Sequence, residues 1–189
     1  MKKIKLEIAS LLCEFEKHND IKDDLIHLIN KSTSHIENKK ADNWEYNISK
    51  CDWDYNEDFT NREWVNLLKP HLQKHFNKCA DFLQYQKCNI KRMWYQQYQK
   101  NDAHGWHIHG ETYTGVYYLQ MPDNATKTEL INHWSQDTEL QIANIEAKEG
   151  DIVIFPSFVI HRSPKIISDI TKTIISFNLE FEGIKEQVR

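Results

Sequence analysis

The sequence predicts an α+β domain in which helices pack against an antiparallel sheet or barrel. Two observations lead to this prediction: apolar residues recur at helical spacing in the first ninety residues, and they alternate with a period of two in the remainder. The chain has 189 residues, which is enough for one domain with a substantial core. We therefore expect a single domain over residues 1–189, with a mainly helical support region at 1–90 and a strand-rich core at 91–183.

The helices are expected in three places before residue 90. Residues 6–15 suit a short amphipathic helix, and residues 21–29 continue the helical spacing with Asp20 as a plausible N-cap. Residues 60–63, Thr-Asn-Arg-Glu, match a capping box that opens a third helix. Pro70 lies inside that helix and predicts a kink or a restart there. The apolar face of the third helix comprises Trp64, Leu67, Leu68, Leu72 and Phe76.

Four segments after residue 90 have the composition and alternation of strands. They are rich in β-branched and aromatic residues and cover 92–99, 114–121, 151–156 and 172–181. In the last segment every second residue from Thr173 to Phe181 forms one face, which we expect to pack under the helices. The other face is more polar, and polar side chains on the inside of a barrel indicate a pocket. That face carries Lys172, Ile174, Ser176 and Asn178.

The composition excludes several classes of function. With 40% hydrophobic and 12% aromatic residues, the chain has a globular rather than a disordered composition. A net charge of −4 and a pI of about 6.2 argue against nucleic-acid binding through overall charge. No apolar run approaches the ~18–20 residues of a membrane span. The four cysteines form no CxxC pair, so we expect reduced, mostly buried thiols in a cytoplasmic protein.

Residues 105–111, Gly-Trp-His-Ile-His-Gly-Glu, contain three candidate metal ligands. Alternate residues of a strand point to the same side, so His107, His109 and Glu111 would face one cavity if the strand extends that far. His161 is the candidate ligand from a distant part of the chain. Two near ligands and one distant histidine, with open positions between them, form the facial triad of non-haem Fe(II) oxygenases; imidazole also suits zinc, copper and nickel.

The chain also resembles a known family through four motifs in order: WHIH, TGVYYLQMP, EGDIVIFPSFVIH and KTIISFN. They resemble the 2-oxoglutarate- and Fe(II)-dependent oxygenases found in bacteria and bacteriophages. In that family a His-x-His step precedes a GVYYL strand, an FPS segment ends on a histidine, and a basic residue begins the final ISFN strand. The resemblance covers residues 92–181 and implies a double-stranded β-helix (a jelly-roll or cupin-like barrel), with the β-helix core at 91–183 backed by the N-terminal helices.

The resemblance implies Fe(II) as cofactor, with 2-oxoglutarate and O2 as cosubstrates. His107, His109 and His161 match the metal-ligand positions of the family. Lys172 stands where the family usually has arginine, and it would pair with the distal carboxylate of 2-oxoglutarate as a point charge rather than through a two-pronged fork. Glu111 stays an alternative to His107, because His109 with Glu111 supplies the His-x-carboxylate step that most such enzymes use.

Other residues near these motifs have two interpretations. His104 either orients a ligand imidazole or is a solvated loop histidine, and we favour the second. The aromatic segment 44–59 and the loop 124–145 either cover the mouth of the pocket or pack against the barrel. Four residues on the predicted strands are candidates for binding the cosubstrate, with ordinary packing as the alternative for the first three. They are Tyr95, Gln97, Tyr117 and Asn178.

The predicted function is therefore hydroxylation of an unidentified substrate, with release of succinate and CO2, in the cytoplasm of a bacterium or a phage-infected cell. One alternative is a cupin-like dioxygenase with three histidines that does not use 2-oxoglutarate. The other is a non-catalytic jelly-roll binding protein. The expected partner is the small-molecule cosubstrate, and we expect no membrane or nucleic-acid partner.

Overall fold

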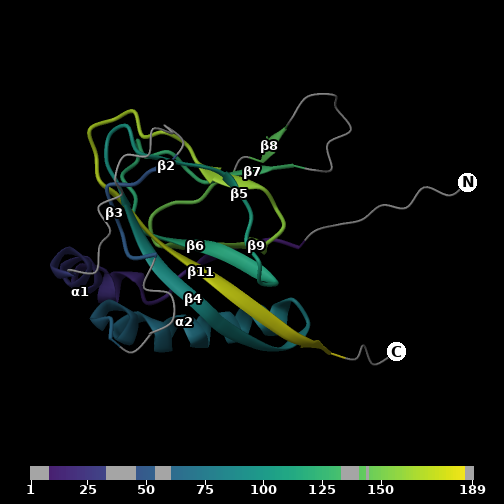
Figure 1. Cartoon of the computed structure of the whole chain (residues 1–189). Coiled ribbons are helices and arrows are strands. Elements are labelled where there is room, and N and C mark those ends of the chain that lie inside the picture. Colours follow the sequence, from purple (N-terminus) through teal and green to yellow (C-terminus); the bar gives the residue numbers. More distant parts are fainter. Residues whose placement is uncertain (1–8, 33–45, 54–60, 133–140, 144, 186–189) are drawn as a thin grey trace, which may run out of the picture.

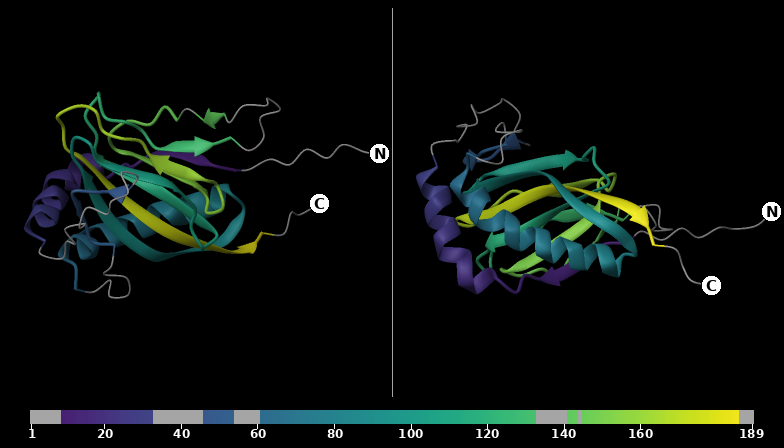
Figure 2. Two further views of the ribbon diagram at one scale, coloured as in Figure 1. Left: turned by 45° about the horizontal axis from the view of Figure 1, so that its top comes forward. Right: turned by 90° about the horizontal axis from the view of Figure 1, so that it is seen from below.

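The computed structural model describes residues 9–32, 46–53, 61–132, 141–143 and 145–185 (Figure 1). These residues form two antiparallel sheets and two helices. The larger sheet has the strand order β1-β9-β6-β11-β4-β3, and the smaller sheet has the order β2-β5-β10-β7-β8. The smaller sheet lies above the larger one, and helix α2 lies across the far face of the larger sheet (Figure 2).

The helices are α1 (His18–Lys31) and α2 (Glu63–Phe82). The strands are β1 (Leu11–Glu14), β2 (Tyr46–Asn47), β3 (Lys50–Cys51), β4 (Tyr85–Tyr98), β5 (Ala103–His107), β6 (Tyr113–Gln120), β7 (Glu129–Ile131), β8 (Ile142–Ala143), β9 (Asp151–Pro156), β10 (His161–Ser163) and β11 (Lys172–Ile184).

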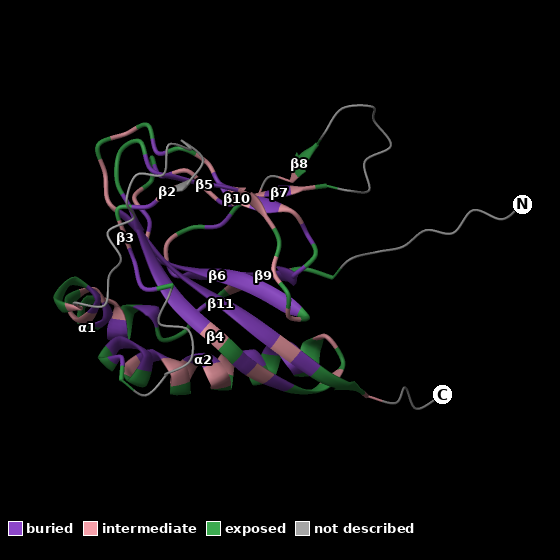
Figure 3. Ribbon diagram, in the orientation of Figure 1, coloured by how far each residue is buried: buried purple, intermediate pink, exposed green. Residues whose placement is uncertain are grey.

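Strand β11 divides its side chains between two cores, as the alternation in its sequence predicts. Ile175, Phe177, Leu179 and Phe181 belong to the core under the helices, where the ring of Phe177 lies 4.6 Å from that of Phe76 on α2. The prediction that this face packs under the helices is confirmed. On the opposite face of β11, Ile174 belongs to a second core that also contains Leu130 of the smaller sheet, so the central strands are buried on both faces (Figure 3).

Gly115 allows the central strands to approach one another. A Cβ atom at this position of β6 would lie 2.2 Å from the carbonyl oxygen of Val153 on β9 and 2.7 Å from the ring of Phe177 on β11. Real Cβ atoms do not make such short contacts with backbone. The glycine is therefore needed for the packing of the sheet.

The first predicted helix is wrong. Residues 11–14 form strand β1, which pairs with β9 in the register of Leu11 with Ile154 and Cys13 with Ile152. The outer edge of β9 offers unpaired backbone groups, and pairing with them outweighs the weak helical spacing of this segment. Residues 1–8 lie outside the described part of the chain.

The second predicted helix is confirmed as α1, but it begins earlier than expected. Lys17 occupies the N-cap position and no side chain caps the helix. Asp20 lies in the first turn, where its carboxylate accepts a hydrogen bond of 2.7 Å from Lys17 Nζ. The prediction of Asp20 as N-cap is therefore wrong, although a carboxylate in the first turn still interacts favourably with the helix dipole.

The third predicted helix is confirmed as α2, with a different start. The helix begins at Glu63, and Arg62 precedes it without a capping hydrogen bond from its side chain. The guanidinium group of Arg62 instead binds the buried carboxylate of Asp52 at 2.9 Å. Thr60 lies outside the described residues. The helix continues through Pro70 and does not restart there.

The strands predicted after residue 90 are confirmed as β4, β6, β9 and β11, and the fold is a double-stranded β-helix. β4 begins at Tyr85 and β11 continues to Ile184, both beyond the predicted bounds. Strand pairing within the described residues stays inside each sheet, so no hydrogen-bonded ladder joins the two sheets into a closed barrel. Neither described helix is long and apolar enough to cross a membrane.

Candidate metal centre

Three histidines meet on the smaller sheet, at the side that faces the larger one. His107 ends β5 and His161 begins β10, and the two residues are direct partners in the antiparallel pair. His109 lies in the loop after β5, where its backbone N–H donates to the carbonyl of Ser157 at 3.0 Å. One possible ligand atom of each imidazole lies within 4.8 Å of those of the other two.

The surroundings of these imidazoles favour the form that binds metal. Nδ1 of His107 donates to the carbonyl of Gly105 at 2.7 Å, and Nδ1 of His161 donates to the carbonyl of Val159 at 2.9 Å. Because a carbonyl only accepts, each ring keeps its proton on Nδ1 and leaves the lone pair of Nε2 for a metal.

Burial keeps the three rings neutral. It lowers the pKa of His161 to about 3 and that of His109 to about 4, and it also lowers the pKa of His107. All three imidazoles are therefore neutral at neutral pH, as ligation requires.

Glu111 does not join this group. Strand β5 ends at His107, so the alternation that would place Glu111 beside the histidines does not extend to it. Its carboxylate accepts a hydrogen bond of 2.6 Å from Nδ2 of Asn178 on β11. The structure thus groups His107 with His109 and His161, and it pairs Glu111 with a different partner.

Lys172 is a fully buried cation that lies close to the same site. Its Nζ donates to the carbonyl of Thr126 at 2.7 Å and to Oγ of Ser163 at 3.2 Å, and it lies 5.4 Å from the ring centre of Tyr98. No carboxylate within the described ranges forms an ion pair with it. Burial lowers the pKa of Lys172 to about 7. An anion that entered here would meet an ammonium group whose hydrogen-bond partners among the described residues are neutral.

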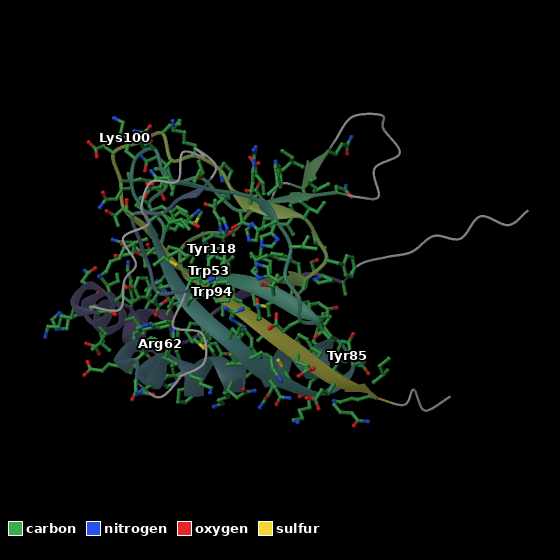
Figure 4. All side chains as sticks on the ribbon, in the orientation of Figure 1. Trp53, Arg62, Tyr85, Trp94, Lys100 and Tyr118 are labelled. Carbon is green, nitrogen blue, oxygen red and sulfur yellow. The ribbon has the colours of Figure 1, made fainter. Side chains whose placement is uncertain are left out.

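Two cavities meet at the histidines. The inner cavity, of about 20 Å³, has room for roughly one water, and its walls include Tyr98, Ser163 and Ser176. The outer cavity, of about 370 Å³, opens toward solvent. Trp53 and Trp94 lie on its wall with their ring centres 6.4 Å apart (Figure 4). The other residues of this wall are Arg92, His104, His107, Ile108, His109, Gly110, Glu111 and Asn178.

Three of the four predicted cosubstrate residues lie on the wrong face of the larger sheet. Tyr95 packs edge-on against Trp64 of α2, and the hydroxyl of Tyr117 lies 2.7 Å from Nδ1 of His18 on α1. Gln97 donates to Oγ1 of Thr173, also on the helix side. The expectation that they line the pocket therefore does not hold.

The register of the strands explains why these side chains face the helices. Gln97 pairs with Thr173 and Tyr95 pairs with Ile175, so both follow the face of β11 that packs under the helices. Their neighbours Gln96 and Tyr98 line the inner cavity instead. Of the four predicted residues, only Asn178 lies on the wall of a cavity at the histidines.

His104, Trp53 and Trp94 lie at the site, although little in the sequence pattern indicates this. His104 is buried on β5 and its ring stacks on that of His107 with centres 3.9 Å apart, so it is not a solvated loop residue. Trp94 is buried, and its indole N–H has no acceptor among the described residues. Trp53 belongs to the aromatic segment that was a candidate cover of the pocket, whereas Trp44 and Trp134 lie outside the described residues.

The fold and the site together define a jelly-roll protein with a histidine cluster that can hold one metal ion and a buried cation that can hold an anion. Three neutral imidazoles fit Fe(II), and Lys172 fits a carboxylate.

Residues 92–178 match the model of a family described as "Putative 2OG-Fe(II) oxygenase". This part of the chain belongs to the 2OG-Fe(II) oxygenases, which use Fe(II), 2-oxoglutarate and O2. The assignment favours a 2-oxoglutarate-dependent oxygenase over the two alternatives, a dioxygenase that does not use 2-oxoglutarate and a non-catalytic binding protein. A search of the curated proteins finds no match.

Solved structures show the same fold over most of the chain. A 2OG-Fe(II) oxygenase family protein from Burkholderia pseudomallei has a TM-score of 0.63 at 10% identity, covering 94% of this chain and 88% of its own. The viral collagen prolyl hydroxylase of Paramecium Bursaria Chlorella virus-1, in complex with 2OG, has a TM-score of 0.62 at 14% identity, covering 90% and 94%. HygX from Streptomyces hygroscopicus, with nickel and 2-oxoglutarate bound, has a TM-score of 0.63 at 8% identity, covering 95% and 85%.

Proposed function

We propose that this oxygenase is a hydroxylase in which His107, His109 and His161 hold Fe(II) and Lys172 binds the distal carboxylate of 2-oxoglutarate. The observation that carries the proposal is the combination of three convergent, neutral imidazoles with one buried cation that has no anionic partner among the described residues. When bound, Fe(II) supplies the activation of O2 that couples the decarboxylation of 2-oxoglutarate to succinate and CO2 with insertion of a hydroxyl group into a substrate C–H bond.

The protein residues have three tasks in this reaction. The imidazoles occupy one side of the metal position and leave the other side to the reactants. Lys172 draws the distal carboxylate toward the inner end of the site, where burial strengthens the attraction between the charges. The indole N–H of Trp94, which has no acceptor among the described residues, is available to an oxygen atom of a bound ligand.

His107 is the proposed near ligand rather than Glu111. Its ring already faces that of His161, with centres 4.2 Å apart, and its Nδ1–H is held by a carbonyl. The carboxylate of Glu111 would have to leave Asn178 to reach the metal. A site of three neutral ligands leaves the full charge of the metal ion to attract the dianion 2-oxoglutarate.

A matched pair of variants tests this assignment. We expect His107→Ala to lose both Fe(II) binding and 2-oxoglutarate consumption, and Glu111→Gln to keep both. The measurements are the iron content of anaerobically reconstituted protein and the succinate formed with Fe(II), ascorbate and O2. The opposite pattern would assign the ligand to Glu111, and no 2-oxoglutarate consumption by the wild type would contradict the proposed activity.

A variant of Lys172 distinguishes the proposed 2-oxoglutarate-dependent enzyme from a dioxygenase that does not use 2-oxoglutarate. Lys172→Met should raise the 2-oxoglutarate concentration needed for half-maximal turnover and leave the binding of Fe(II) unchanged. We further propose a cytoplasmic location, which the free state of all four cysteines supports.

A further inference from the structure

A second group of metal-binding side chains lies on the helix side of the larger sheet, away from the three histidines. Cys13 comes from the edge strand β1, and His75 and Cys79 come from α2. His75 and Cys79 are four residues apart and therefore lie one above the other on the same helix face. One possible ligand atom of each of the three residues lies within 4.8 Å of those of the other two.

The imidazole of His75 has a buried nitrogen without a hydrogen-bond partner. Its Nε2 is buried and has no hydrogen-bond partner among the described residues, while its ring packs edge-on against Phe15 at 5.6 Å. A buried polar atom without a partner is costly to the folded protein in free energy. A metal ion bound to this nitrogen would remove that cost.

The two thiols are arranged to attract a cation. One possible ligand atom of each thiol lies within 4.8 Å of that of the other and of a ring nitrogen of His75, and Cys79 is buried. The thiolate is the form of cysteine that binds metal. Binding of a metal would therefore release protons from the two thiols.

We propose that Cys13, His75 and Cys79 form a second metal site, selective for a thiophilic divalent cation of the zinc type. Zinc–sulfur bonds of about 2.3 Å and zinc–nitrogen bonds of about 2.0–2.1 Å place neighbouring ligand atoms roughly 3.5–3.8 Å apart, so the distances within the group have to shorten by about 1.3 Å at most. Two cysteines and one histidine leave a fourth position for water, and Cys13 and His75 are only partly buried.

The donor atoms of the two sites select different metals. The site at His107, His109 and His161 offers nitrogen alone and suits Fe(II), whereas sulfur at the second site favours zinc. A metal at the second site would tie β1 to α2. Since β1 pairs with β9, the metal would fix the outer edge of the larger sheet. We therefore expect it to affect stability and not turnover.

Cobalt(II) titration of the reduced, full-length protein tests the proposal independently of enzyme activity. Charge-transfer absorption from sulfur to cobalt arises only at a site with thiolate ligands, so the three-histidine site does not contribute to it. We expect the wild type to develop this absorption to saturation at one cobalt ion per chain at the thiol site, and Zn²⁺ to displace it. Cys13→Ser should abolish the absorption and weaken zinc binding at this site by more than about 100-fold. A loss of that size exceeds the effect of changing a residue that only surrounds the ligands.

Cys88→Ser is the matched control. Cys88 is also a buried cysteine on the helix side of the sheet, but it is not one of the three grouped residues. This variant should keep the cobalt–sulfur absorption and the zinc affinity of the wild type. Both variants, reconstituted with Fe(II), should keep the 2-oxoglutarate consumption of the wild type.

A second measurement covers the case in which Cys13→Ser does not fold. In the wild type, Zn²⁺ should protect Cys13 and Cys79 from alkylation, as measured by mass spectrometry, and leave Cys88 unaffected. The proposal is overturned if the wild type shows no cobalt–sulfur absorption, if Cys13→Ser keeps it, or if zinc gives no protection. It is also overturned if Cys13 and Cys79 are joined by a disulfide whose reduction produces no metal binding.

Discussion

The replacement Lys172→Met should make the protein more stable while it damages the binding of 2-oxoglutarate. The ammonium group is fully buried, and its hydrogen-bond acceptors among the described residues are both neutral: the carbonyl of Thr126 and the hydroxyl of Ser163. Methionine has a similar shape and no charge. The variant therefore removes a buried charge without opening a large cavity.

The magnitude follows from the pKa of Lys172, which burial lowers from 10.5 to about 7. At about 1.4 kcal/mol per pKa unit, keeping the proton on this amine in the folded protein costs on the order of 5 kcal/mol. The variant leaves the acceptors of Thr126 and Ser163 without this donor, which offsets about 1–3 kcal/mol of the gain. We expect a net increase of about 2–4 kcal/mol in the free energy of unfolding at neutral pH.

The effect has a definite dependence on pH. Between pH 7 and 10.5 the unfolded chain keeps the lysine proton and the folded protein loses it, so the stability of the wild type rises with pH. The slope approaches 1.4 kcal/mol per pH unit for this one group, and Lys172→Met lacks that contribution. The advantage of the variant should therefore be largest near neutral pH and shrink as the pH rises.

Urea-induced unfolding of the metal-free protein between about pH 7 and 9 measures this difference. Lys100→Met is the control, because Lys100 is an exposed loop residue (Figure 4) and its replacement should follow the pH profile of the wild type. A thermal-shift titration then shows whether 2-oxoglutarate stabilises the wild type but not Lys172→Met. Parallel pH profiles for wild type and Lys172→Met would refute the reasoning, and so would a variant less stable than the wild type at pH 7.

Three further predictions follow from the packing. Gly115→Ala should lower the free energy of unfolding by at least about 1–3 kcal/mol in urea titration, because its Cβ would meet the backbone oxygen of Val153, which cannot rotate away. Asp52→Ala should lower it by about 3–5 kcal/mol by leaving the buried guanidinium of Arg62 without its carboxylate, whereas an unchanged value would contradict that pairing. Tyr117→Phe should cost about 1 kcal/mol of stability and leave the kinetics with 2-oxoglutarate unchanged, since its hydroxyl lies on the helix side; impaired kinetics would return Tyr117 to the site.

The parts of the fold that could be predicted from the sequence are those whose local pattern agrees with their tertiary environment. β9 is mostly apolar and residues 172–179 of β11 carry only one charge because both faces of these stretches are buried, and that pattern is visible in the chain. The histidines at 107, 109 and 161 could be named because their motifs stand in a fixed order along the sequence.

What could not be predicted depends on contacts between distant segments. Whether Tyr95 or its neighbour Gln96 faces the pocket is decided by the register between β4 and β11, and a shift of one residue reverses the answer. The grouping of Cys13 with Cys79 likewise arises from an edge strand packing against a helix far along the chain. Spacing within the sequence contains no trace of it.

The edge position of β1 has a consequence for handling the protein. β1 covers the outer edge of β9, whose apolar residues Ile152 and Ile154 are buried in the core. On β1 itself, Leu12 has 49% of its surface exposed. A truncation that removed residues 9–14 would uncover a row of unsatisfied backbone groups along an apolar strand, which is a template for pairing between molecules. Such a fragment should aggregate during expression even though it retains every residue of the histidine cluster.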